Sequence, residues 1–331
     1  KKHLFVIRIR NRQNMKLKLF IIFLLFLPCL IFANRAYTPW YTGPLLADNG
    51  TNTAKGMIDI QPYLFFRDTN GVYNKSWGHG STPSTFTFHA QLEFEAGLTK
   101  WFDIKFIGNA LYKDKEGEKS FEVGDTTVEL GIQLLRDKIY TITPAIRLTI
   151  IESFPTGKYK NLNPSKLGID SSGSGSFETI FGFVIEKVVY WFESHPIRFR
   201  INPTYAYSPK VSVKNFNTYG GGFNTNGKVS PGGFFSGIVS FEFSFTQRWV
   251  FAMDIVETYS GKTTFKGIPG TNQDGSIASN TKGTSDQTSL APAIEYNFSA
   301  NLGMLAGSHF SIRGKNSTDF VSGIISATYT F

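Results

Sequence analysis

The chain has 331 residues, of which 41% are hydrophobic and 15% aromatic, and a formal net charge of +9. The excess charge belongs to the first 33 residues, which carry seven of the 34 Lys and Arg and no acid. The remaining 27 basic residues face 25 acidic ones, a net charge of about +2, so nucleic-acid binding loses its electrostatic basis. The single cysteine, Cys29, lies in the same N-terminal stretch, which excludes a disulfide framework and a thiolate metal site beyond it.

The N-terminal region predicts an export signal. Met15-Lys-Leu-Lys18 is a positive start, and residues 19–32 form an apolar run broken only by Pro28. A run of this length is too short to cross a bilayer as a helix, which needs about 20 residues, and is typical of a secretory signal. We interpret 1–14 as an upstream over-extension and 15–33 as a signal peptide cleaved after Ala33 or, alternatively, after Ala36. A retained N-terminal anchor is the competing interpretation. Residues 34–56 follow as a periplasmic or plug-like segment.

Twelve segments with a two-residue period fill residues 57–331. In the clearest one, Phe88, Leu92 and Phe94 share one parity, while Gln91 and Glu93 share the other, as in a strand with one apolar face. Lengths near ten residues suit tilted membrane strands. The predicted strands are 57–67, 86–98, 102–112, 121–135, 139–153, 177–187, 196–207, 233–245, 249–259, 289–298, 302–312 and 320–331.

The connections alternate between tight turns and long loops. The turns are 99–101, 136–138, 246–248 and 299–301, and the long Gly- and Asn-rich loops are 68–83, 154–176, 208–232 and 260–288. This alternation is typical of an outer-membrane barrel, in which the short turns are periplasmic. We therefore predict an all-β fold, a monomeric transmembrane antiparallel up-and-down β-barrel of about twelve strands, in the bacterial outer membrane. A soluble β-sandwich is the alternative.

Aromatic residues are placed as two membrane girdles and a terminal signal. Trp101, Tyr140, Tyr190, Trp191 and Trp249 fall at the short-turn ends, and Tyr112, Tyr205, Tyr207 and Tyr259 at the long-loop ends, where amphipathic rings favour the headgroup level. Tyr329 and Phe331 end the last strand in the manner of the signal read by the barrel-insertion machinery. The expected partners are that machinery, outer-membrane lipid and lipopolysaccharide, together with a small solute of unknown identity.

Four prolines oppose this assignment, because a closed barrel has no edge that hides a missing ladder donor. Pro62, Pro144, Pro203 and Pro292 lie inside predicted strands on the outward parity. We expect bulges or shortened pairing at these positions.

With one face of each strand apolar, the polar parity is expected to line the interior. Inside a barrel, charges must pair or face water, so Arg147, Arg198 and Arg200 are expected to bridge to glutamates. The alternative is a charge-selective constriction. Twelve strands leave a narrow pore that a loop or the N-terminal segment can block. The candidate pore-lining residues are His89, Glu93, Glu95, Lys105, Glu129, Arg147, Glu178, Arg198, Arg200, Glu242, Asp254 and Glu295, with Asp59, Gln61, Gln91, Asn109, Gln133, Glu186 and Asn202 on the same face.

Motifs for catalysis are poor. Gly222 and Lys228 have the spacing of a phosphate loop, but Val229 replaces the magnesium-binding hydroxyl and no helix follows. His309 and Ser311 have the His-x-Ser spacing of outer-membrane phospholipases, yet their parity turns them inward. The five histidines have no metal-ligand spacing. We predict no enzymatic activity, no cofactor and no metal.

Three short motifs resemble a known family. Trp40-Tyr-Thr-Gly-Pro-Leu-Leu46, Ile60-Gln-Pro-Tyr-Leu-Phe65 with Gly71-Val-Tyr73, and Phe154-Pro-Thr-Gly-Lys-Tyr159 are similar to the phenol-degradation meta-pathway transporters of the outer membrane. The resemblance covers most of the chain after the signal and implies passage of small, often aromatic or hydrophobic, compounds. The first function hypothesis is therefore a channel or uptake pore. A structural or surface-interaction barrel without transport is the alternative, and an outer-membrane lipid hydrolase is a distant third.

Overall fold

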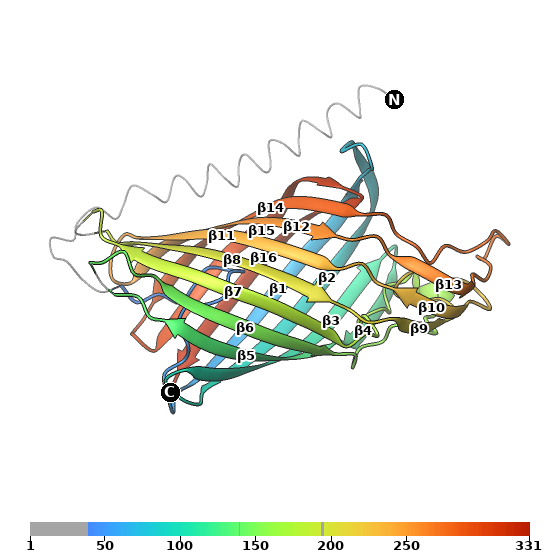
Figure 1. Ribbon diagram of the computed structural model, residues 1–331. Coiled ribbons are helices and arrows are strands. Elements are labelled where there is room, and N and C mark those ends of the chain that lie inside the picture. The colour runs from blue at the N-terminus through green and yellow to red at the C-terminus, as the bar shows by residue number, and fades with distance from the viewer. Residues whose placement is uncertain (1–38, 139, 193–194) are drawn as a thin grey trace, which may run out of the picture.

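The computed structural model describes residues 39–138, 140–192 and 195–331, and the predicted signal at 1–33 lies outside them. Twelve long antiparallel strands close into a barrel in chain order (Figure 1). Closure is complete because β1 pairs with β2 on one side and with β16 on the other, and β2 pairs with β3. The barrel strands are β1 (Ile58–Tyr73), β2 (His79–Gly97), β3 (Phe102–Lys115), β5 (Thr126–Leu135), β6 (Ala145–Phe154), β7 (Glu178–Val189), β8 (Ile197–Tyr207), β11 (Phe234–Ser244), β12 (Trp249–Ser260), β14 (Ser285–Asn297), β15 (Leu302–Lys315) and β16 (Ser317–Thr330).

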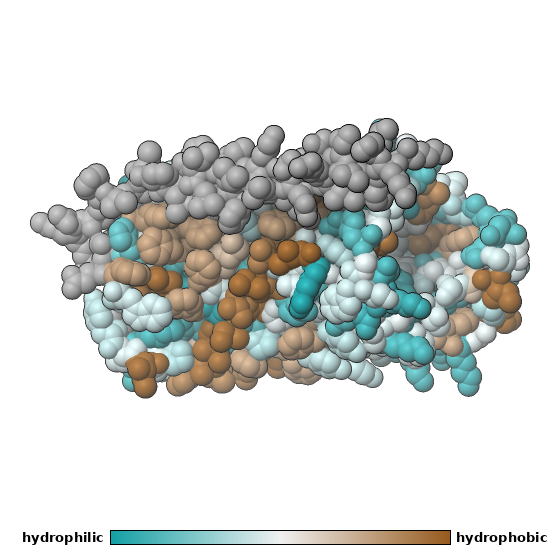
Figure 2. Space-filling view, turned by 90° about the horizontal axis from the view of Figure 1, so that it is seen from above, coloured by the Kyte–Doolittle hydropathy of each residue, from teal (hydrophilic) through white to brown (hydrophobic). Residues whose placement is uncertain are grey.

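The predicted twelve-stranded transmembrane barrel is confirmed, and its outer face is apolar. Along β2, Phe94 is 37% exposed on the outside, whereas the next residue, Glu95, is buried inside. Phe106, Val239 and Ile325 are exposed on the same outer surface. Figure 2 shows hydrophobic residues gathered over the barrel strands and hydrophilic ones increasing toward the long-loop end. Among the described residues, no helix is long and apolar enough to cross a membrane.

Both predicted girdles are present. At the short-turn end, Trp101, Tyr140 and Trp191 are exposed, and Tyr140 packs against Tyr190 with ring centroids 5.0 Å apart. At the long-loop end, Tyr205, Tyr207 and Tyr259 are exposed. Rings at two levels match the two headgroup regions of a bilayer. This arrangement gives the apolar belt a defined upper and lower limit.

The long loops are more ordered than the sequence indicates. Three short strands, β9 (Val211–Lys214), β10 (Asn226–Ser230) and β13 (Thr264–Ile268), pair into a separate sheet at the long-loop end (Figure 1). Its small core consists of Val211, Val213 and Val229, with Tyr159, Tyr219 and Phe265 packed around it. A single 3-10 turn, η2 (Pro164–Lys166), begins at the N-cap Asn163, whose side chain accepts a hydrogen bond from the Ser165 amide.

Three predicted boundaries are wrong. The loop at 68–83 is mostly strand, because β1 and β2 continue pairing beyond the apolar belt. The strand at 121–135 is divided into β4 (Glu118–Val123) and β5 by Gly124 and Asp125. The strand at 139–153 begins only at Ala145, because Pro144 has no ladder donor and the Asp137 carboxylate holds the preceding turn through the Val188 amide at 3.0 Å.

The prolines interrupt the hydrogen-bond ladder without shifting the register. The pairing of β1 with β16 omits Gln61 and Pro62, that of β7 with β8 omits Pro203, and that of β14 with β15 omits Pro292. In each case, pairing resumes with the same partners in register. Shortened pairing is therefore the outcome, and the register shifts of the barrel lie elsewhere, between Thr69 and Gly71 for example.

Candidate functional site

The short-turn half of the barrel lumen holds an extended segment of the chain, residues 39–57, called here the plug. Its backbone amides donate to side chains of the inner wall, one strand after another. The Thr42 amide donates to Glu295 Oε2 at 2.9 Å, and the Leu46 amide to Asp254 Oδ2 at 2.9 Å. The plug then follows the wall past β8, β7, β5 and β3, through the amides of Asp48, Gly50, Asn52 and Thr53, which donate to Asn202, Glu186, Gln133 and Asp103.

Two glycines allow this close approach. A Cβ atom at Gly50 would collide with the Glu186 side chain, and one at Gly97 would collide with the carbonyl of Ala54. The backbone of the plug therefore lies directly against the wall at both places.

One side of the lumen carries a network of buried charges. Arg147 donates to Asp103 at 2.7 Å and lies 2.9 Å from Glu129, so its guanidinium joins β6 to β3 and β5. The Lys105 ammonium lies 3.0 Å from Asp48 of the plug and 3.7 Å from both Glu95 and Glu129, and 3.8 Å from Glu93. The expected pairing of arginines with acids is confirmed here.

Two more arginines continue the network. Arg198 donates to both carboxylate oxygens of Glu242 at 2.5 Å, and Arg200 donates to Glu186 at 2.6 Å. The Arg198 guanidinium also lies 3.9 Å from the ring centroid of Tyr41 in the plug. Because each arginine contacts both the wall and the plug region, the network fixes the barrel and seats the plug together.

Asp48 is the plug's charged contact with the wall. Burial acts to raise the pKa of its carboxyl, but the positive charges of Lys105 and Arg147 outweigh burial and hold the pKa below its ordinary value. The contact therefore contributes stability above the ordinary carboxyl pKa of about 3.9 and loses it only as the pH falls through the lowered value. At neutral pH, this contact keeps the plug seated.

The opposite side of the lumen carries an apolar patch beside the acids Asp254 and Glu295, which corrects the expectation that the whole interior is polar. Ala252, Ala291, Ala293, Leu305 and Ile324 point inward from β12 and β14–β16 and form one buried cluster with Tyr63 of β1. Leu45 of the plug inserts into this cluster and is only 3% exposed, with Leu46 and Phe65 packed beside it. The lumen thus has a charged side and, opposite it, this apolar patch, which we call the apolar track.

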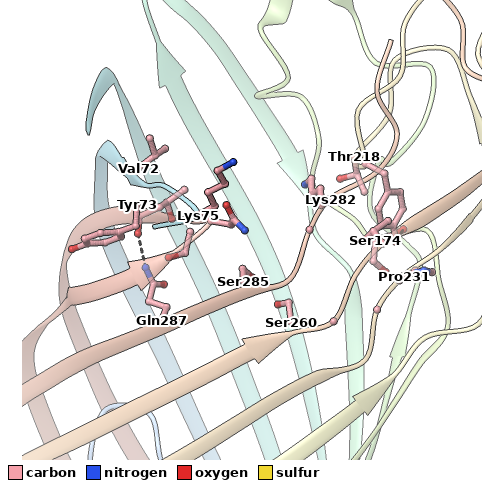
Figure 3. A pocket seen from close by; sticks show the side chains of 18 of the residues that line it. Val72, Tyr73, Lys75, Ser174, Thr218, Pro231, Ser260, Lys282, Ser285 and Gln287 are labelled. Atoms are coloured by element: carbon pink, nitrogen blue, oxygen red, sulfur yellow. Dashed lines mark hydrogen bonds between the residues drawn. The ribbon is translucent and has the colours of Figure 1, made fainter. Parts of the chain in front are cut away.

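Two cavities lie along the lumen. At the long-loop end, a mouth of about 1060 Å³ is lined by residues such as Tyr73, Lys75, Tyr219, Lys282 and Gln287 (Figure 3). Its wall is braced by Gln287 Nε2, which donates to the Thr318 carbonyl at 2.5 Å. Deeper in the barrel, a pocket of about 190 Å³ lies between the plug and the β1–β3 wall, against Gln61, Tyr63, Phe65, Gln91, Glu93 and Lys105.

The structure places the sequence-predicted residues unevenly. Glu95, Lys105, Glu129, Arg147, Arg198, Arg200 and Glu242 form the charged network, while Asp254 and Glu295 receive plug amides. His89 lies nearer the mouth and bonds to Asn109 at 2.8 Å. Glu178 is apart from them, at the long-loop rim, where it accepts a hydrogen bond from Ser208 at 2.6 Å.

Sequence reasoning missed two wall residues. Asp103 has the inward parity of its strand, between the outward Phe102 and Ile104, so the period of two already indicated it. Arg67 ends the predicted first strand, but that strand continues to Tyr73, which places Arg67 well inside the barrel wall. The plug's own contacts, through backbone amides, have no side-chain pattern to reveal them.

The weak motifs have structural roles. Asn226 and Lys228 belong to strand β10, so the glycine-rich run at 222–228 does not lead into a helix. His309 Nε2 bonds to the Ser289 hydroxyl at 2.8 Å, and Ser311 donates to Asp319 at 2.7 Å, both on the inner face. Within residues 39–331 as far as they are described, no cluster of three potential metal ligands occurs.

The aromatic residues of the 208–232 loop pack onto one another. Phe216 and Phe223 meet edge to face with centroids 5.0 Å apart, and Tyr219 packs on the small loop core. Of these rings, that of Tyr219 also lines the mouth. Phe216 and Phe223 therefore pack within the loop and do not line the mouth.

No protein-family model matches the chain, and no curated protein matches it. Among solved structures, an outer membrane channel from Pseudomonas putida F1 has a TM-score of 0.65 and 11% sequence identity, over 87% of this chain and 100% of that one. The transport unit of the autotransporter AIDA-I from Escherichia coli gives 0.47 and 11%, over 85% and 92%. The Pseudomonas putida toluene transporter TodX gives 0.38 and 10%, over 82% and 89%. At these identities the likeness establishes the fold alone, that of an outer-membrane barrel, and the two scores below 0.5 add nothing to it.

Proposed function

We propose that this protein is an outer-membrane uptake channel for small aromatic or hydrophobic compounds, with a lumen restricted by its own N-terminal plug. The observation that carries the proposal is the divided lumen. An apolar track of Tyr63, Leu305, Ile324 and small alanines runs beside a wall of cross-strand ion pairs. An apolar ring is favoured against the first surface, while the ion pairs of the second join neighbouring strands of the barrel wall.

The seating of the plug supports a passage rather than a permanent filling. Its bonds to the wall are separate hydrogen bonds, from backbone amides such as those of Thr42 and Leu46 and from wall side chains such as Arg147, and each contributes about 0.5–3 kcal/mol net. Leu45 is its one fully buried apolar anchor in the track. A solute that competes for the track competes with Leu45, so occupancy of the track and release of the plug are coupled.

The alternative is a structural barrel that displays its ordered loops. The plug and the three-stranded loop sheet favour it, since both reduce the open cross-section. The mouth of about 1060 Å³ and the pocket of about 190 Å³ favour transport, because a display scaffold has no need of cavities at successive depths. An enzymatic role has no support in the inward placement of His309 and Ser311.

The family resemblance also belongs to this proposal. Trp40-Tyr-Thr-Gly-Pro-Leu-Leu46, which resembles the phenol-degradation meta-pathway transporters, supplies the plug residues that reach β14, β12 and the apolar track. We assign the chain to that group on this basis. Tyr329 and Phe331 stack 5.9 Å apart on the exposed outer face of the last strand, where the barrel-insertion machinery would read them and where lipid and lipopolysaccharide surround the barrel.

Uptake by intact cells tests the proposal. In a Gram-negative strain without general porins, the lipopolysaccharide leaflet slows the entry of both phenol and a pentose, so influx reports passage through the channel. Expression of the protein should speed the influx of labelled phenol more than that of the pentose, because the apolar track favours the aromatic ring. Ile324→Thr on the track should reduce phenol influx and leave the pentose rate unchanged. Ile325→Thr, one residue further on the lipid face, is the matched control and should change neither.

Equal acceleration of both solutes would indicate a general pore. No acceleration of either, with the protein folded in the membrane, would favour the structural alternative.

A further inference from the structure

Basic side chains form a cross-strand row on the lumen wall, between the mouth and the deeper pocket. Arg67 of β1 is in register with Thr87 of β2, and Thr87 with Lys113 of β3. On its other side, Arg67 is in register with Ser322 of β16, which is in register with His309 of β15. Strand alternation puts these residues on the inner face. The row therefore crosses five adjacent strands at one depth of the barrel.

Arg67 is the basic group of this row that has no hydrogen-bond partner among the described residues. Its guanidinium lies 4.1 Å from the ring centroid of Phe320, and no carboxylate among the described residues forms an ion pair with it. Asp68 follows it in the chain but has the opposite parity, and its carboxylate accepts a hydrogen bond from Asn70 at 2.8 Å. A guanidinium has five N–H donors, so Arg67 presents unused donors to the lumen.

The acid nearest in the register is already engaged. Asp319 of β16 pairs with Gly71, four residues along β1 from Arg67, and lies 2.9 Å from His79 Nε2. It also accepts a hydrogen bond from the Ser311 hydroxyl at 2.7 Å.

The other basic groups of the row are occupied. Lys113 donates to the Ser171 carbonyl and interacts electrostatically with the carboxylates of Asp170 and Glu122. His309 bonds to Ser289. Arg67 is therefore the group in the row that is available to an anion.

Aromatic rings surround Arg67 on both sides. Phe65 stacks on His89 with centroids 5.0 Å apart and planes 16° apart, and Tyr63 stacks on Phe65 at 5.7 Å. On the mouth side, Phe320 meets His309 edge to face at 4.8 Å. Phe65 and Tyr63 line the pocket of about 190 Å³, where the apolar track begins. A planar apolar group can therefore lie against Phe65, which is two residues deeper along β1 than Arg67.

We propose that Arg67, with the Phe65–His89 stack and Phe320, forms a binding subsite for small aromatic carboxylates on their way through the lumen. The carboxylate accepts two N–H bonds from the guanidinium, and the ring lies against Phe65. A bidentate pair of this kind is charge-assisted and geometrically selective. The inference rests on the proposed channel and adds aromatic carboxylates to the solutes that it favours.

The test uses benzoate and benzamide, which have almost the same shape and differ in charge. Single-channel current through the purified protein should be blocked by benzoate at a lower concentration than by benzamide. Arg67→Gln should raise the half-blocking concentration of benzoate about tenfold or more, the loss of one charge-assisted contact, and leave that of benzamide unchanged. Arg67→Lys should give a half-blocking concentration of benzoate between that of the native protein and that of Arg67→Gln. Lys75→Gln, which removes a positive charge at the mouth, is the matched control and should change benzoate block about twofold or less.

Calorimetric titration of the detergent-solubilised protein with benzoate repeats the comparison without any current. Equal affinity for benzoate and benzamide, or equal effects of Arg67→Gln and Lys75→Gln, would overturn the subsite. Specific benzoate binding in a protein that carries no current would uphold the subsite and overturn the channel.

Discussion

Deletion of residues 39–55 should raise the single-channel conductance several-fold, the largest functional change expected for this protein. The segment occupies the short-turn half of the lumen, where its amides bind Glu295, Asp254 and Gln133. Its removal leaves a twelve-stranded wall with a hydrated charged face, and a barrel of this size has an interior wider than side chains alone fill. The barrel strands begin at Ile58, so the deletion ends before the first of them.

A point variant separates plug release from the deletion itself. Leu45→Asp buries a carboxylate in the apolar track, which is strongly unfavourable, and should expel the plug and reproduce most of the rise. Lys55→Asp introduces the same side chain at an exposed plug position, where the carboxylate is not buried. This variant should leave the conductance near the native value. A deletion variant that folds and conducts like the native protein would show that the plug does not restrict the lumen.

Arg147→Met should destabilise the folded barrel by about 3–5 kcal/mol, because it leaves the buried Asp103 carboxylate without a cation and leaves Glu129 with Lys105 alone. The side chain is only 1% exposed and joins Asp103 to Glu129 across three strands. Equilibrium unfolding in urea, followed by tryptophan fluorescence in lipid vesicles, measures the change.

The matched control is Lys166→Met in the long-loop region. Lys166 also forms a close ion pair, 2.9 Å from Glu118, but the two side chains are 34% and 40% exposed. A pair at such a surface contributes about 0–1 kcal/mol, so this variant should unfold nearly like the native protein. Similar losses for both variants would mean that the lumen network contributes no more than a surface pair.

The wall of the barrel was predictable because a single physical rule governs it. Lipid on one side and the barrel interior on the other enforce a period of two. The faces of Phe94 and Glu95 could therefore be predicted from residue type and parity alone. The same rule located Lys105, Arg147 and Arg200, and charge neutrality in a buried lumen required that they pair.

The sequence allowed a plug-like segment at 34–56, but the path of the plug along the wall and the apolar track were not predictable in this way. The plug binds through amides, which every residue carries, so the path of residues 39–57 leaves no pattern in the sequence. The track depends on Ala252, Ala291 and Ala293. Alanine suits both the lipid face and the lumen face of a strand, so its position indicates neither. The track also depends on Leu45, which reaches it from outside the strands. The first strand was predicted to end at Arg67 but continues to Tyr73. Its true end depends on pairing beyond the apolar belt, where lipid no longer enforces alternation.

Cysteine modification beside the plug tests most directly whether solutes pass through the lumen. The chain beyond residue 33 has no native cysteine, so Gln91→Cys places one thiol on the pocket between the plug and the wall, and Leu92→Cys places one on the lipid face of the same strand. A small charged thiosulfonate added to the aqueous phase should sharply reduce the current through Gln91→Cys and leave that through Leu92→Cys unchanged. A current that survives complete labelling of Gln91→Cys, verified by mass, would contradict passage along the lumen.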